Sequence, residues 1–77
     1  MSEKPLRLAS KLKMIRQRLG LSQTEMVQRL NFKGHYGRIS EYELGKRQPS
    51  ISTLLLYARA AGLRLEEIVD DELELGF

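Results

Sequence analysis

Apolar side chains recur every three or four residues along this chain, and glycines divide the pattern into short segments. The first segment has its apolar residues at Leu8, Leu12, Ile15 and Leu19. This spacing places all four side chains on one face of an α-helix. Successive apolar segments are followed by Gly20, Gly45 and Gly62. Glycine accepts the left-handed conformation that ends many helices, so the pattern predicts an all-helical fold.

Five helices are expected, and the start of the second is the most clearly marked. Ser22 and Glu25 have the spacing of a capping box, in which each side chain accepts a hydrogen bond from the backbone amide of the other residue. The third helix is predicted at about 36–44, and Ser50 is placed to cap the fourth. A short fifth helix is expected at 65–69, although Arg64 is a poor cap for it.

The last segment, 71–77, is acidic and has apolar residues at alternate positions, namely Leu73, Leu75 and Phe77. Alternation is typical of an extended chain, which could add a strand or contact a partner. We favour a frayed terminus, because chain ends are commonly poorly ordered. The sequence is therefore interpreted as one domain, 1–77, with a core at about 8–70 and an acidic, apolar tail.

Charge is distributed unevenly along the 77 residues, although the net charge is only +3. Residues 1–49 contain eleven Lys or Arg and four Asp or Glu, whereas residues 50–77 contain two and six. A basic half and an acidic half on one small domain are typical of a protein with a phosphate-binding face. Ordinary solvated charge explains the asymmetry alone equally well.

The composition also argues against several classes of function. The chain has no cysteine, so it can form neither disulfides nor thiolate metal sites. His35 is the only histidine and cannot build a metal site by itself. No stretch resembles a signal peptide or approaches the ~20 apolar residues of a membrane span. We therefore expect a soluble, cytoplasmic protein with no cofactor, no metal, no small-molecule ligand and no active site.

Two runs of residues carry a resemblance to a known family: Leu21-Ser22-Gln23 at the start of the second helix, and ISEYELGKRQPS at 39–50. Further matches lie at 54–55, 58, 61–63 and 66–68. With these residues, 8–70 resembles the lambda-repressor and Cro-like (XRE-type) helix-turn-helix family. The resemblance implies a five-helix, lambda-repressor-like domain whose second and third helices form the helix-turn-helix. The connection between these helices is longer than usual, which leaves the start of the third helix open.

The resemblance also implies sequence-specific binding of double-stranded DNA by a transcriptional regulator, a repressor or an autoregulator, and it assigns roles to residues. Base-reading positions fall on the outward face of the third helix, at Tyr36, Gly37, Arg38, Ser40 and Glu41. The resemblance implies contacts to the DNA backbone for Gln23, Lys46 and Arg47. Lys33 and His35 are further candidates for such contacts. Each of these cations could instead be merely solvent-facing, and the carboxylate of Glu41 could be a solvated surface acid.

A structural role is implied for two further residues. In the family pattern Arg16 and Glu43 form a partly buried ion pair between the first and third helices, although they could be unrelated surface charges. A homodimer is also implied, and its interface is expected at the fifth helix and the tail, at Leu65, Val69, Leu73, Leu75 and Phe77. The alternative function is a protein-interaction module, or an antitoxin-like partner, on the same scaffold. Retention of Gln23, Arg38, Lys46 and Arg47 together favours DNA binding.

Overall fold

The computed structural model describes residues 7–32 and 37–77. Within these ranges the chain forms five α-helices and no strand: α1 (Leu8–Arg18), α2 (Gln23–Arg29), α3 (Gly37–Glu43), α4 (Ile51–Ala61) and α5 (Leu65–Val69). The all-helical, five-helix prediction is confirmed. α3 is shorter than expected, because it ends at Glu43, and Tyr36 lies outside the described residues.

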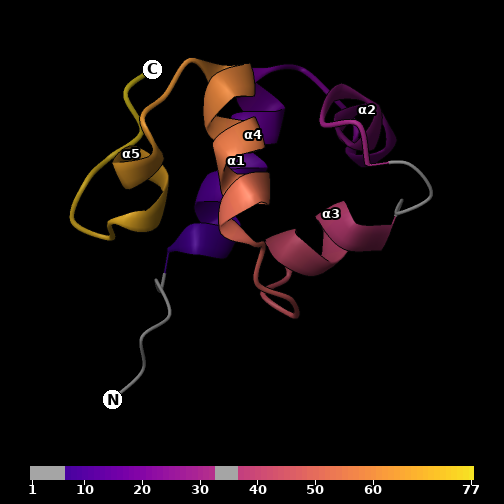
Figure 1. Cartoon of the computed structure of the whole chain (residues 1–77), viewed down its shortest axis with the longest axis horizontal. Coiled ribbons are helices and arrows are strands. Elements are labelled where there is room, and N and C mark those ends of the chain that lie inside the picture. The colour runs from indigo at the N-terminus through magenta and orange to yellow at the C-terminus, as the bar shows by residue number, and fades with distance from the viewer. Residues whose placement is uncertain (1–6, 33–36) are drawn as a thin grey trace.

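The helices are arranged around a central pair. Figure 1 shows α1 and α4 at the centre, with α2 and α3 on one side and α5 with the C-terminal tail on the other. α1 contacts α3, α4 and α5, whereas α2 packs on α3. The helix-turn-helix and the tail therefore lie on opposite sides of the same two helices.

The expected caps are present and explain where the helices begin. Ser22 Oγ accepts a hydrogen bond from the Glu25 amide at 3.1 Å, and Glu25 Oε1 accepts one from the Ser22 amide at 2.8 Å, so the capping box is confirmed. Ser50 accepts from the Thr53 amide at 3.2 Å. At α5, Glu67 Oε2 accepts from the Arg64 amide at 2.7 Å. The Glu67 carboxylate thus pairs a free backbone amide at the start of α5. The Arg64 side chain cannot do so, because it has no hydrogen-bond acceptor.

The core is formed by the apolar faces of all five helices. Of the predicted first stripe, Leu8, Leu12 and Ile15 are buried and Leu19 is partly buried. The core also contains Met26, Val27, Leu30, Ile39, Tyr42, Leu54, Tyr57, Ala58 and Ile68. The rings of Phe32 and Tyr42 meet edge to face, with centroids 6.4 Å apart. This contact joins the end of α2 to α3.

Lys11 is a charged residue buried within this apolar core, with 0 % of its surface exposed. Its ammonium donates hydrogen bonds to three backbone carbonyls, those of Glu67 at 2.8 Å, Asp70 at 2.7 Å and Leu73 at 2.6 Å. The three donors of the ammonium are thus all used, which compensates for the loss of water. Lys11 therefore ties α1 to the end of α5 and to the segment that follows.

The expectation of a frayed terminus is wrong, because the tail folds back on the domain. Arg7 donates from its amide to Asp71 Oδ1 at 3.0 Å and from its guanidinium to Glu74 Oε1 at 3.0 Å. Leu75 packs against the core, and the Arg18 guanidinium lies 5.4 Å from the centre of the Phe77 ring. The acidic tail is therefore held by cations of α1 and of the residue before it. The alternating pattern of the tail does not reveal these partners.

We predict that Lys11→Met lowers the free energy of unfolding by about 2–4 kcal/mol, because three carbonyls lose a charged donor. Lys13→Met is the control, since Lys13 is exposed on the same helix. Urea unfolding followed by circular dichroism measures both variants. If Lys11→Met unfolds at the same urea concentration as the control, the ammonium does not hold the tail.

The hydroxyl of Tyr57 is buried without a hydrogen-bond partner among the described residues, and burial raises the pKa of this phenol. We predict that Tyr57→Phe stabilises the protein by about 1–2 kcal/mol, because it removes an unsatisfied polar group while keeping the ring. Tyr42→Phe, at a second core tyrosine, is the matched control. A fall in melting temperature for Tyr57→Phe would show that the hydroxyl is bonded after all.

Candidate nucleic-acid interface

α3 presents a polar face to the surface. Ile39 and Tyr42 are buried, whereas Gly37 is exposed and Arg38, Ser40 and Glu41 are partly exposed. The helical period explains this division, because the two buried residues are three positions apart and face α1 and α2. The four described residues expected to read bases therefore lie together on the outer side of α3. Three other expected residues, Lys33, His35 and Tyr36, lie outside the described residues.

Arg38 is placed at the junction of three helices. It lines a surface hollow of about 110 Å³ together with Phe32, Tyr42 and Thr53. Arg38 therefore lies beside the aromatic contact between Phe32, which follows α2, and Tyr42 of α3. A long side chain can cover apolar surface in this way while its charged end remains in water.

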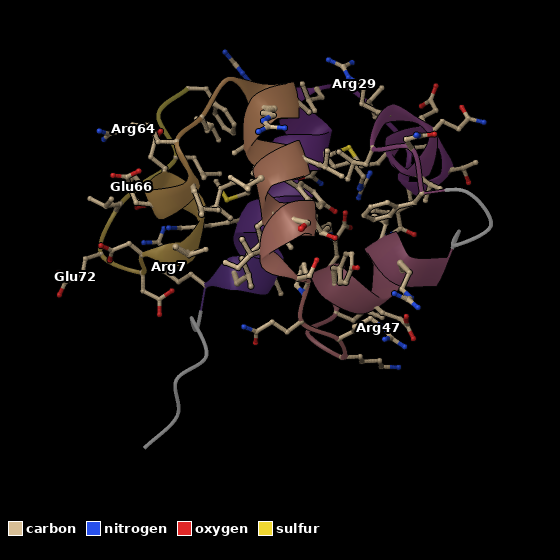
Figure 2. All side chains as sticks on the ribbon, in the orientation of Figure 1. Arg7, Arg29, Arg47, Arg64, Glu66 and Glu72 are labelled. Carbon is tan, nitrogen blue, oxygen red and sulfur yellow. The ribbon has the colours of Figure 1, made fainter. Side chains whose placement is uncertain are left out.

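A basic loop follows α3 directly. Gly45 takes the left-handed conformation, with φ of 74°, and reverses the chain. Lys46, Arg47 and Gln48 are then exposed, whereas Pro49 is buried and returns the chain to the core. Figure 2 shows Arg47 at the outer edge of the molecule, beside α3. Two of the expected DNA-backbone cations are thus next to the face expected to read bases.

Glu41 connects this loop to α3. Its carbonyl accepts hydrogen bonds from the amides of Lys46 at 2.9 Å and Arg47 at 3.3 Å. Its carboxylate accepts one from Arg47 Nε at 2.9 Å. Sequence reasoning treated Glu41 and Arg47 separately and missed this contact. The signal that could have found it is the glycine turn between them, which brings residues six positions apart together.

Arg16 and Glu43 form the ion pair that the resemblance implied. Arg16 Nε and Nη2 donate to Glu43 Oε2 and Oε1, at 2.6 and 3.0 Å, in a two-pronged contact. The side chains are only 14 % and 3 % exposed. Arg16 Nη1 also donates to the carbonyl of Leu21 at 2.9 Å. The hydrogen bonds to Glu43 raise the pKa of Arg16 above its usual value, so the guanidinium stays charged.

Gln23 is attached to the same ion pair. Its Nε2 donates to Glu43 Oε1 at 3.2 Å, which links the first residue of α2 to the last residue of α3. An amide nitrogen carries two hydrogens, so one donor of Nε2 remains for another acceptor. Sequence reasoning assigned Gln23 to the DNA backbone and did not foresee the contact with Glu43. The ion pair therefore orients a residue expected at the interface.

The charges on the two sides of the molecule differ. In Figure 2, Arg47 lies beside α3, whereas Glu66 and Glu72 lie on the far side, around α5 and the tail, together with Arg7 and Arg64. The acids of the second half of the sequence thus lie away from α3, beside cations of their own, whereas the exposed Lys46 and Arg47 lie next to it. In the part of the chain that the structure describes, no group of acidic or histidine side chains could hold a metal ion. No described helix is long and apolar enough to cross a membrane.

We predict that Glu43→Ala lowers the free energy of unfolding by about 3–5 kcal/mol, because it leaves the Arg16 guanidinium partly buried without its partner. Glu41→Ala is the matched control, since that carboxylate is 42 % exposed. Thermal unfolding of both variants decides the matter. Equal melting temperatures would count against a structural role for the ion pair.

Comparison with known proteins agrees with this geometry. A family model described as helix-turn-helix matches residues 12–68, which include all of α2, α3, α4 and most of α1 and α5. Neither a curated protein nor a solved structure matches the chain. The matched span contains the α2–α3 unit, the ion pair and the basic loop. The chain therefore belongs to the Cro/C1-type (XRE-like) helix-turn-helix family of DNA-binding transcription regulators, with an all-helical fold consistent with that of lambda repressor.

Proposed function

We propose that this protein binds specific sequences of double-stranded DNA through α3, which enters the major groove, and acts as a repressor or autoregulator. The observation that carries the proposal is the outer surface of α3: polar residues face outward, and an exposed basic loop is bonded to the same helix. The major groove of B-DNA is wide enough for an α-helix, and each base pair displays a distinct pattern of donors and acceptors there.

Arg38 and Ser40 are the described residues that we propose as base readers, together with Gly37 at the start of α3 and Tyr36 before it. Arginine can donate two hydrogen bonds to guanine, and a serine hydroxyl can donate or accept. Gly37 leaves open space where a side chain would stand, which suits a close approach of the helix backbone to DNA. Glu41 lies on the same face, but its Oε1 already accepts a hydrogen bond from Arg47, which favours a different role.

Contacts to the DNA backbone are proposed for the residues around α3. Lys46 and Arg47 follow the helix, and Gln23 stands at the start of α2, held by Glu43. Lys33 and His35 precede α3 in the sequence and are further candidates. Contacts to phosphates orient a protein on the duplex, whereas contacts to base edges select the sequence.

We further propose a homodimer, whose two recognition helices would stand ~34 Å apart on a palindromic site, one turn of the DNA helix. The face expected to bind the second copy is partly used within the monomer, because Leu65, Val69 and Leu75 pack against the chain's own core. Phe77 is 44 % exposed and remains the most accessible apolar residue of the tail. It is therefore the centre of the proposed contact between the two copies.

Binding to a random-sequence duplex at several salt concentrations tests DNA binding. If ~6 phosphates are contacted, the affinity should fall ~10³-fold between 50 and 200 mM salt, because counterions are released. Lys46→Ala should lower the slope of log affinity against log salt by ~0.9, whereas Arg64→Ala on the far side should not change it.

Sites selected from a random pool should be palindromic if a dimer binds.

Salt-independent or undetectable binding would contradict the proposal. It would instead favour the protein-interaction module as the role of this scaffold. An unchanged slope for Lys46→Ala with a reduced slope for Arg64→Ala would place the DNA on the opposite side of the molecule.

A further inference from the structure

Glu41 is an acid on the face that we propose meets DNA, where its charge would repel phosphates. The structure gives this carboxylate a defined partner, the Nε of Arg47 at 2.9 Å. We propose that Glu41 is a positioning residue that holds Arg47 as a two-pronged phosphate clamp, and that it does not read a base. This inference rests on the proposed DNA binding of α3.

Glu41 controls both the backbone and the side chain of Arg47. The Glu41 carbonyl accepts the amide of Arg47 at 3.3 Å and that of Lys46 at 2.9 Å, and this fixes where the loop starts. The carboxylate then fixes the direction of the Arg47 guanidinium through Nε. A flexible side chain is thus held in one orientation relative to α3, so less rotational freedom is lost when it binds a ligand.

The contact with Glu41 uses the inner edge of the guanidinium and leaves its outer edge for a ligand. Among the described residues, Arg47 Nη1 and Nη2 have no hydrogen-bond partner. Guanidinium is planar, and its two terminal nitrogens match the two free oxygens of a backbone phosphate. An arginine held at Nε can therefore still bind a phosphate with two hydrogen bonds.

Stability does not explain this ion pair. The Arg47 and Glu41 side chains are 46 % and 42 % exposed. Exposed pairs contribute little to folding, because water and salt screen them and ordering two side chains has an entropic cost. The contrast is with Arg16 and Glu43, which are largely buried. The geometry of the exposed pair is thus better explained by what Arg47 binds.

The test uses a double-mutant cycle of Glu41→Ala and Arg47→Ala, measured on a random duplex and on a selected site. Removal of an acid raises the net charge, so simple electrostatics predicts tighter binding for Glu41→Ala. The clamp predicts the opposite, a loss of about five- to tenfold on both duplexes. In the Arg47→Ala background, Glu41→Ala should not weaken binding further. Because the second substitution removes a negative charge, the double variant should bind DNA as tightly as Arg47→Ala or more tightly.

Two conservative variants separate the clamp from a general effect on folding. Glu41→Gln keeps an acceptor for Nε and should bind within about twofold of the unaltered protein, or more tightly. Arg47→Lys keeps the charge but lacks the forked guanidinium. In this background Glu41→Ala should therefore have much less effect on DNA affinity. Circular dichroism melting should place every variant close to the unaltered protein.

Three results would overturn the inference. Tighter binding by Glu41→Ala to the random duplex would show that the carboxylate only repels DNA. A loss confined to one base pair of the selected site, additive with Arg47→Ala, would make Glu41 a base reader. If the unaltered protein shows no salt-dependent DNA binding, the proposed function fails and the clamp fails with it. The first two outcomes leave the proposed function intact.

Discussion

The buried ion pair between Arg16 and Glu43 is the contact on which the arrangement of the helix-turn-helix depends. It joins α1, in the centre of the domain, to the last residue of α3, and it holds Gln23 at the first residue of α2. A guanidinium and a carboxylate with two parallel hydrogen bonds have a defined geometry, unlike an apolar contact. The pair therefore sets the direction of α3 relative to the core, and the polar surface of that helix is placed accordingly.

α1 organises the other side of the molecule in a similar way. Lys11 bonds the carbonyls at the end of α5 and in the tail, so the acidic segment is built into the domain. A small chain buries a limited apolar area, and polar contacts of this kind compensate for a modest core. The result is a domain with acidic groups at α5 and the tail, and exposed cations in the loop after α3. Exposed cations beside α3 favour the approach of a polyanion to that side.

The sequence predicted what depends on local patterns. The apolar stripe of α1, the capping box of Ser22 and Glu25 and the fifth helix are confirmed, because each depends on neighbours a few residues away. The burial of the Lys11 ammonium and the folding of the tail were not predicted. The partners of Lys11 are backbone carbonyls 56 to 62 positions away, and no side-chain pattern encodes such contacts. The position of Lys11 beside the apolar stripe was the available hint. The pairing of Glu41 with Arg47 depends on the geometry of a glycine turn, which periodicity alone does not describe.

The central claim is that the outer face of α3 and the loop after it form the surface that binds DNA. Nuclear magnetic resonance titration of the labelled protein with a selected duplex tests it most directly. The account predicts that the amide signals of residues 37–47 and of the start of α2 shift on binding, while those of α5 and the tail stay in place. Shifts concentrated in α5 and the tail, with α3 unaffected, would contradict it.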